Sequence, residues 1–246
     1  MKRYEVGRGD PVVLVHGLGD DHRAWRRVVA PLMLTRRVVL YDLRGHGASP
    51  LGDADGSLAQ LGADLVGVLD DAGIDRATIA GFSLGGTIAM RAAIDAPDRV
   101  RALALIATSS RVNSAARAWY EERAAMVERD DPNLRATLDK DTEEIYRARP
   151  EEIDAGLRVR RESTADPRGF ANACRAMASL RLDDEIGAIA VPTVLIAGDA
   201  DQLCPPRASE IIAEQIDGAT LRVLEGAGHP LPVERPDEVA QAILEL

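Results

Sequence analysis

The feature that most restricts the fold is the hexapeptide Gly-Phe-Ser-Leu-Gly-Gly at residues 81–86, which lies between a strand-like and a helix-like segment. Residues 78–82 form a short apolar run, and residues 84–95 have the length of a helix that ends before Pro97. A strand that turns into a helix within one residue needs neighbours without side chains, because the two elements approach closely. The G-x-S-x-G pattern in this context indicates that Ser83 is raised out of a sheet on a sharp turn.

Short apolar runs alternate with longer amphipathic segments on both sides of this turn. Strands are predicted at residues 11–16, 37–42, 78–82, 100–107, 192–198 and 220–224, with one short leading strand near 3–6. Helices are predicted at residues 21–34, 57–73, 84–95 and 206–216 and from 236 onward, with a capping box formed by Ser57 and Gln60. The alternation predicts an α/β fold with a mostly parallel central sheet flanked by helices.

Residues 111–184 interrupt this pattern. Strand signals are absent there, and charged amphipathic helices are predicted at residues 115–129, 132–140, 151–161 and 168–180. We therefore expect a core made of residues 1–110 and 185–246, with an inserted helical lid at residues 111–184.

Composition narrows the classes of function. With 46% hydrophobic and 28% charged residues, the chain has the balance of a globular protein. Its net charge of −10 argues against nucleic-acid or anionic-membrane partners, which both require basic surface. The first residues lack the apolar stretch of a signal peptide, no apolar run is long enough to cross a bilayer, and Cys174 and Cys204 form no CxxC pair. We expect a cytoplasmic protein with free thiols; the sequence does not set its oligomeric state.

A serine hydroxyl is a weak nucleophile and needs a base. His229 is the favoured base, because it follows the last predicted strand in a loop of glycines and a proline, where a histidine has no core to pack against. His16 ends the first buried strand and is expected to order the following turn, whereas His22 and His46 are expected to be ordinary structural residues, His46 on a surface loop. No HxH or HExxH pattern occurs among the four histidines, so neither a metal nor a cofactor is expected.

The acid and the oxyanion donors are predicted from their positions after strands. Asp199 and Asp201 both follow the strand at 192–198. Asp201 is favoured as the acid because it lies further along the loop, toward the end of the sheet where His229 arrives, and Asp199 is expected to brace the turn. The backbone N–H groups of Leu18 and Leu84 are the predicted oxyanion hole.

Five motifs together resemble the α/β-hydrolase superfamily. They are His-Gly-Leu-Gly at 16–19, Asp-Leu-Arg-Gly-His-Gly-Ala-Ser at 42–49, the hexapeptide at 81–86, Gly-Asp-Ala-Asp at 198–201 and Gly-His at 228–229. The resemblance implies the α/β-hydrolase fold and a serine hydrolase with the triad Ser83, Asp201 and His229 in that superfamily's chain order. Residues 105–111 and 169–177, with Trp119, further resemble 3-oxoadipate enol-lactonases and related carboxylesterases.

The expected substrate is a small carboxylic ester or lactone. Aromatic residues make up only 3% of the chain, which favours a small or aliphatic acyl group. Arg111 and Arg175 could bind a substrate carboxylate, but with 28 arginines in the chain the favoured interpretation is that both are solvated lid arginines. Trp119 could face either the pocket or the lid core. Three alternatives use the same triad: an acyl thioesterase, a lyase resembling the menaquinone-pathway cyclohexadiene synthase (which usually has arginine where Thr87 stands), and a hydrolase-fold ligand receptor.

Overall fold

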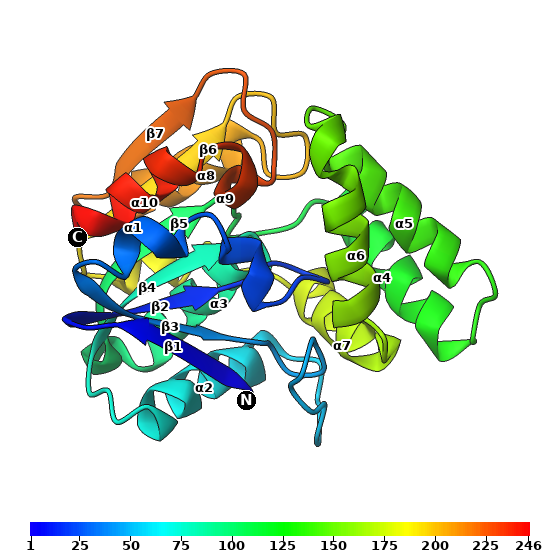
Figure 1. Ribbon diagram of the computed structural model, residues 1–246, viewed down its shortest axis with the longest axis horizontal. Coiled ribbons are helices and arrows are strands. Elements are labelled where there is room, and N and C mark those ends of the chain that lie inside the picture. The colour runs from blue at the N-terminus through cyan, green and yellow to red at the C-terminus, as the bar shows by residue number, and fades with distance from the viewer.

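The computed structural model describes residues 1–246 and is built on one seven-stranded sheet (Figure 1). Its strands are β1 Arg3–Gly7, β2 Asp10–Val15, β3 Arg36–Tyr41, β4 Ala77–Phe82, β5 Val100–Ile106, β6 Thr193–Gly198 and β7 Thr220–Leu224. They lie in the order β1-β3-β2-β4-β5-β6-β7, and every neighbouring pair is parallel except β1 and β3. The predicted α/β fold with a mostly parallel sheet is confirmed.

The two faces of the sheet carry separate hydrophobic cores, since successive strand residues point to opposite sides. Val13 and Val15 of β2 pack on the face covered by α2 (Leu58–Asp71), α3 (Leu84–Asp95) and α8 (Pro206–Gln215). Val12 and Leu14 pack on the face covered by α1 (Val29–Leu32), α9 (Leu231–Glu234) and α10 (Pro236–Leu244). Covering both faces leaves the ends of the strands as the place for a site.

Four helices follow β5 and lie together beside the sheet: α4 Ser114–Glu128, α5 Leu134–Ile145, α6 Ile153–Ser163 and α7 Pro167–Ala178 (Figure 1). Residues 111–184 contain these helices, and we call this segment the helical insertion. Its small core includes Leu138, Phe170 and Cys174. Met177 of α7 also belongs to the larger core of the sheet, so the insertion packs directly on the body of the protein.

The prediction of one continuous helix at residues 21–34 is wrong. The structure has a 3₁₀ helix at His22–Trp25 and the short helix α1 at Val29–Leu32. A continuous helix would place Pro31 in its interior, where proline has no N–H to donate and its ring clashes with the carbonyl four residues earlier. The chain therefore restarts the helix so that Pro31 lies in the first turn of α1.

The other predicted helices differ from the structure only in detail, whereas the short helix α9 was not predicted. The capping box before α2 is half correct: Ser57 accepts from the Gln60 N–H, but the Gln60 side chain accepts from the Asp55 N–H instead of the Ser57 N–H. Helix α5 continues to Ile145 rather than ending at residue 140. No helix is both long and apolar enough to span a membrane.

Candidate active site

Ser83 lies on a strained turn between β4 and α3. Its φ of 52° and ψ of −118° are rare for a residue with a side chain. The Ser83 N–H donates to the Ile106 carbonyl oxygen at 2.9 Å, and the Thr108 hydroxyl donates to the Ser83 carbonyl oxygen at 2.7 Å. Strand β5 and the residues after it therefore hold the turn in place.

The glycines around Ser83 are required by close backbone contacts. A Cβ atom at Gly81 would lie 2.3 Å from the Gly85 carbonyl oxygen, and one at Gly85 would lie 2.1 Å from the Val15 carbonyl oxygen. Neither position has room for a methyl group, so helix α3 can start directly against the ends of β4 and β2 only with glycine at both.

Ser83, His229 and Asp201 form a continuous series of hydrogen bonds. His229 Nε2 is 3.2 Å from Ser83 Oγ, and His229 Nδ1 is 2.8 Å from Asp201 Oδ2. Because a carboxylate only accepts, Nδ1 carries the proton of the neutral ring, and Nε2 is left to accept from the serine hydroxyl. The structure thus brings together the three residues that the sequence singled out, in the arrangement that lets an imidazole remove a serine proton.

The Asp201 carboxylate is held in its charged form. Burial alone would raise the pKa of Asp201, but the charge and hydrogen bond of His229 and the N–H groups of Cys204 and Leu203 outweigh it, so the pKa is lowered. Those two N–H groups donate to Asp201 Oδ1 at 2.9 and 2.8 Å. Asp199 instead accepts from the Gly226 N–H at 2.7 Å and makes no hydrogen bond with His229.

The turn after β2 presents a free backbone donor. The Leu18 N–H makes no hydrogen bond, whereas the neighbouring Gly19 N–H donates to His46 Nε2 at 3.3 Å. The Leu84 N–H opens helix α3, where the first N–H groups have no intrahelical acceptor. Neither of the two predicted oxyanion donors is therefore used in a hydrogen bond within the protein.

Two buried histidines fix this turn. His46 donates from Nδ1 to the Arg44 carbonyl oxygen, and burial is the main reason why its pKa falls to about 3. It is therefore neutral and able to accept from Gly19. His16 donates to the Gly17 carbonyl oxygen at 2.8 Å and accepts from the Leu43 N–H at 2.9 Å. The expectation of a surface position for His46 was wrong, since the ring is fully buried.

A cavity of about 430 Å³ opens at Ser83 and His229. The core contributes Leu18 and Phe82 to its lining, and the helical insertion contributes residues including Trp119. Half of the lining residues are hydrophobic. This volume and this mixed lining are typical of sites for small organic molecules.

The model of the alpha/beta hydrolase fold family matches residues 10–236. The chain belongs to this family. It is 31% identical over 235 residues to 3-oxoadipate enol-lactonase 1 of Acinetobacter baylyi, covering 94% of this chain and 85% of that protein. The crystal structure of the enol-lactonase from Burkholderia xenovorans LB400 matches with a TM-score of 0.90 and 27% identity, over 99% of this chain and 95% of that one. A thermophilic esterase from Thermogutta terrifontis, solved with malate bound, matches with a TM-score of 0.88 and 29% identity, over 99% of this chain and 91% of that one.

The two arginines that the sequence suggested as carboxylate ligands lie elsewhere on this α/β-hydrolase fold. Arg111 is exposed and pairs with Asp183 at 3.1 Å, and Arg175 is exposed and pairs with Glu128. Neither lines the cavity, so the alternative of solvated arginines fits both. The buried arginine that does line it is Arg160 of α6, which the sequence analysis did not single out.

Glu234 is a second residue that the sequence did not reveal. It is buried in α9, and its carboxylate accepts from the Gly228 N–H at 2.7 Å. The loop before His229 also packs on the acid loop without room for a side chain, since a Cβ at Gly198 would lie 2.2 Å from the Ala227 carbonyl oxygen. These contacts set the position of His229 relative to Asp201.

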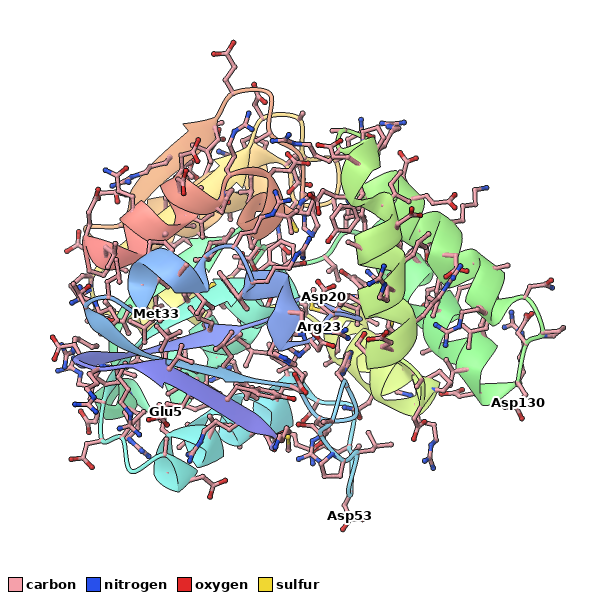
Figure 2. All side chains as sticks on the ribbon, in the orientation of Figure 1. Glu5, Asp20, Arg23, Met33, Asp53 and Asp130 are labelled. Carbon is pink, nitrogen blue, oxygen red and sulfur yellow. The ribbon has the colours of Figure 1, made fainter.

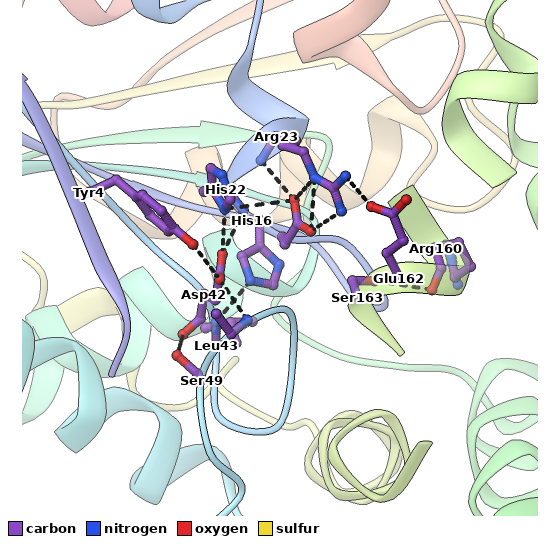
Figure 3. A network of polar contacts seen from close by, with 12 residues as sticks. Tyr4, His16, His22, Arg23, Asp42, Leu43, Ser49, Arg160, Glu162 and Ser163 are labelled. Atoms are coloured by element: carbon purple, nitrogen blue, oxygen red, sulfur yellow. Dashed lines mark hydrogen bonds and ion pairs between the residues drawn. The ribbon is translucent and has the colours of Figure 1, made fainter. Parts of the chain in front are cut away.

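A polar network around Asp42 joins the N-terminal strand to the loop after β3 (Figure 3). Asp42 accepts from the His22 ring at 2.8 Å and from the Ala48 N–H at 3.0 Å, and Tyr4 also donates to it. Burial would raise the pKa of Asp42, but these hydrogen bonds outweigh it and lower the value to about 2. Asp21 lies close by and accepts from Arg23. Asp21 and Asp42 therefore have hydrogen-bond partners within the protein, and their role here is to hold these segments together.

Proposed function

We propose that this protein hydrolyses a small carboxylic ester or lactone through an acyl-enzyme formed on Ser83. The observation that carries the proposal is the hydrogen-bonded series Asp201–His229–Ser83, which ends on a strained turn at a cavity of about 430 Å³. The resemblance to enzymes named enol-lactonase and esterase supports the same class of reaction.

In the proposed first step, His229 Nε2 takes the proton of Ser83 as Oγ attacks the carbonyl carbon. The carbonyl oxygen becomes an oxyanion and accepts from the N–H groups of Leu18 and Leu84. The intermediate then collapses: the C=O bond re-forms, the bond from the carbonyl carbon to the alcohol oxygen breaks, and His229 gives its proton to that oxygen, which in a lactone is the former ring oxygen. Asp201 stabilises the imidazolium throughout.

In the second step, water enters beside the acyl-enzyme; the alcohol of an ester has left, whereas the hydroxyl freed from a lactone stays on the acyl chain. His229 takes a proton from this water, whose oxygen attacks the acyl carbon, and the second oxyanion uses the same two N–H groups. Its collapse breaks the bond to Ser83 Oγ, and His229 returns the proton to the serine. The products are the free carboxylic acid and the starting enzyme.

The test is a panel of p-nitrophenyl esters of increasing chain length, lactones and acyl-CoA thioesters, assayed with wild type and with Ser83→Ala. We expect turnover of short esters or lactones, and a loss of about 10⁴-fold or more in Ser83→Ala. The matched control is Ser179→Ala, a serine on the outer end of α7 with local backbone partners only.

Two other outcomes would favour the thioesterase or the receptor alternative. A clear preference for acyl-CoA would assign a thioesterase. Single-turnover labelling of Ser83 by a phosphonate, with no turnover of any substrate, would favour a ligand receptor. Equal activity of Ser83→Ala and wild type would refute the proposal.

A further inference from the structure

One arginine of the helical insertion is buried without a partner. Arg160 of α6 is 5% exposed and lines the cavity at Ser83. Its Nε atom has no hydrogen-bond partner, and its guanidinium forms no ion pair with any carboxylate. Three other arginines of the insertion are paired with carboxylates: Arg123 with Asp141, Arg161 with Asp139 and Arg175 with Glu128. The insertion arginines without an ion pair that lie at its surface, Arg117 and Arg158, are exposed, whereas Arg160 is buried.

Arg160 packs directly on the turn that carries the Leu18 N–H. A Cβ atom at Gly19 would lie 2.7 Å from Arg160 Nη1, so only glycine leaves room for the guanidinium there. On the same helix, Ser163 donates to the Gly19 carbonyl oxygen. The Phe170 ring lies 6.0 Å from the guanidinium carbon and completes its surroundings. The positive charge is therefore fixed beside the proposed oxyanion hole.

None of the acidic side chains that line the cavity forms an ion pair with Arg160. Asp141 is bound by Arg123, and Glu144 pairs with Arg147. Asp20 lies where the core faces the insertion (Figure 2), and its carboxyl group makes no hydrogen bond and no ion pair. Burial raises the pKa of Asp20 even though the charge of Arg160 opposes that shift.

Arg160 is 5% exposed, its Nε is buried without an acceptor, and its Nη atoms make no hydrogen bond within the protein. A mostly buried guanidinium of this kind gains most from an anion that fits it. A carboxylate fits best, because its two oxygens match the planar fork of the guanidinium. We propose that Arg160 binds a carboxylate of the substrate, so that the enzyme prefers an ester or lactone that carries a carboxylate a few atoms from the reacting carbonyl. Half-esters of small dicarboxylic acids are the simplest members of this class. This inference rests on the proposed function.

The experiment compares monoethyl glutarate with diethyl glutarate, which differ only in the charged end. Wild type, Arg160→Gln, Arg160→Lys and the control Arg175→Gln are assayed at pH 7.5 by alkali consumption. We expect wild type to prefer the half-ester. Arg160→Gln should lose about 10- to 100-fold in kcat/KM on the half-ester, the usual worth of hydrogen bonds to a charged group, and about threefold or less on the diester. Arg160→Lys should retain part of the preference, and Arg175→Gln all of it.

Inhibition gives a second readout that does not depend on turnover of the half-ester. Glutarate should inhibit the hydrolysis of p-nitrophenyl acetate competitively in wild type, and Arg160→Gln should weaken this inhibition at least tenfold. If Arg160→Gln does not fold, Arg160→Lys carries the test, since it keeps the charge and loses the bidentate geometry.

Three results would overturn the inference. Equal losses on both esters would show that Arg160 has only a structural role. A preference for glycine ethyl ester, which carries an ammonium group, would assign the charged subsite to Asp20. Wild type that hydrolyses the diester through Ser83 but has no preference for the half-ester would remove the inference and leave the proposed function intact. Absence of any Ser83-dependent ester turnover would instead refute the proposed function itself.

Discussion

Replacing Asp201 by asparagine should remove activity by imposing the wrong tautomer on His229. Asp201 Oδ1 accepts from two backbone N–H groups, those of Leu203 and Cys204. In Asp201→Asn the amide oxygen must stay at these donors, because the amide NH₂ would face them donor to donor. The NH₂ group therefore points to His229 Nδ1, which must then accept, and the ring proton moves to Nε2. From there it points at Ser83, whose hydroxyl no longer has a base.

The expected loss in kcat is about 10⁴-fold, the size seen when a serine triad loses its acid without losing its geometry. This corresponds to about 5 kcal/mol of activation free energy, since each factor of ten is about 1.36 kcal/mol. Stability should change little, because Asn keeps the side-chain volume and the two backbone hydrogen bonds to its carbonyl oxygen.

The assay is the hydrolysis of p-nitrophenyl acetate, with Ser83→Ala as the measure of background and thermal unfolding as the measure of folding. Asp199→Asn is the matched control, because the Asp199 carboxylate accepts from the Gly226 N–H and makes no hydrogen bond with His229. We expect this control to stay within about threefold of wild type, as a group outside the reacting series should. The reasoning fails if Asp201→Asn keeps a tenth of the wild-type activity, or if Asp199→Asn falls as far.

Three further predictions concern the supports of the site. His46→Leu removes the acceptor of the Gly19 N–H and should cost about 1–3 kcal/mol, seen as a Tm lowered by several degrees in calorimetry. The lowered pKa of Asp42, about 2, stabilises the fold fully above its unfolded value of 3.8, and this stability is lost as the pH falls toward 2. Urea unfolding at pH 5 and pH 2.5 should therefore differ less in Asp42→Asn than in wild type. Ser163→Ala removes the bond from α6 to the Gly19 carbonyl and should lower kcat/KM about fivefold, with a Tm change of a few degrees; an unchanged kcat/KM would count against this coupling.

The fold could be predicted because the sequence pattern of each segment agrees with the contacts that the segment makes in the folded protein. The apolar runs before Ser83 and before Asp199 are β4 and β6, and the glycines that follow them are required by backbone contacts that any such turn creates. The prediction failed at residues 21–34, where the apolar pattern favoured one helix and Pro31 prevented it. The spacing of apolar residues indicates which side of a helix is buried. It does not indicate where the backbone hydrogen bonds of the helix must end.

The supports of the site could not be predicted, because their environment is made by distant parts of the chain. His46 has a sequence context of glycines that favours an exposed loop, and it is buried only because the turn at Gly19 and the histidine His16 lie against it. Glu234 is an ordinary acidic residue in a short helix until the Gly228 N–H reaches it. Neither burial nor hydrogen-bond partners follow from neighbours in sequence.

The arginines of the helical insertion show the same limit at the proposed carboxylate subsite. The sequence suggested Arg111 and Arg175 as carboxylate ligands and did not single out Arg160, which lies in a run of mostly charged residues at 158–162. What distinguishes Arg160 is the face of α6 on which it lies, next to the bond from Ser163 to the turn that carries Leu18. Because one helix face holds both the proposed anion ligand and the brace of the proposed oxyanion hole, a change in the helical insertion that moves α6 should alter substrate choice and turnover together. Substitutions on the outer face, such as Arg175→Gln, should alter neither.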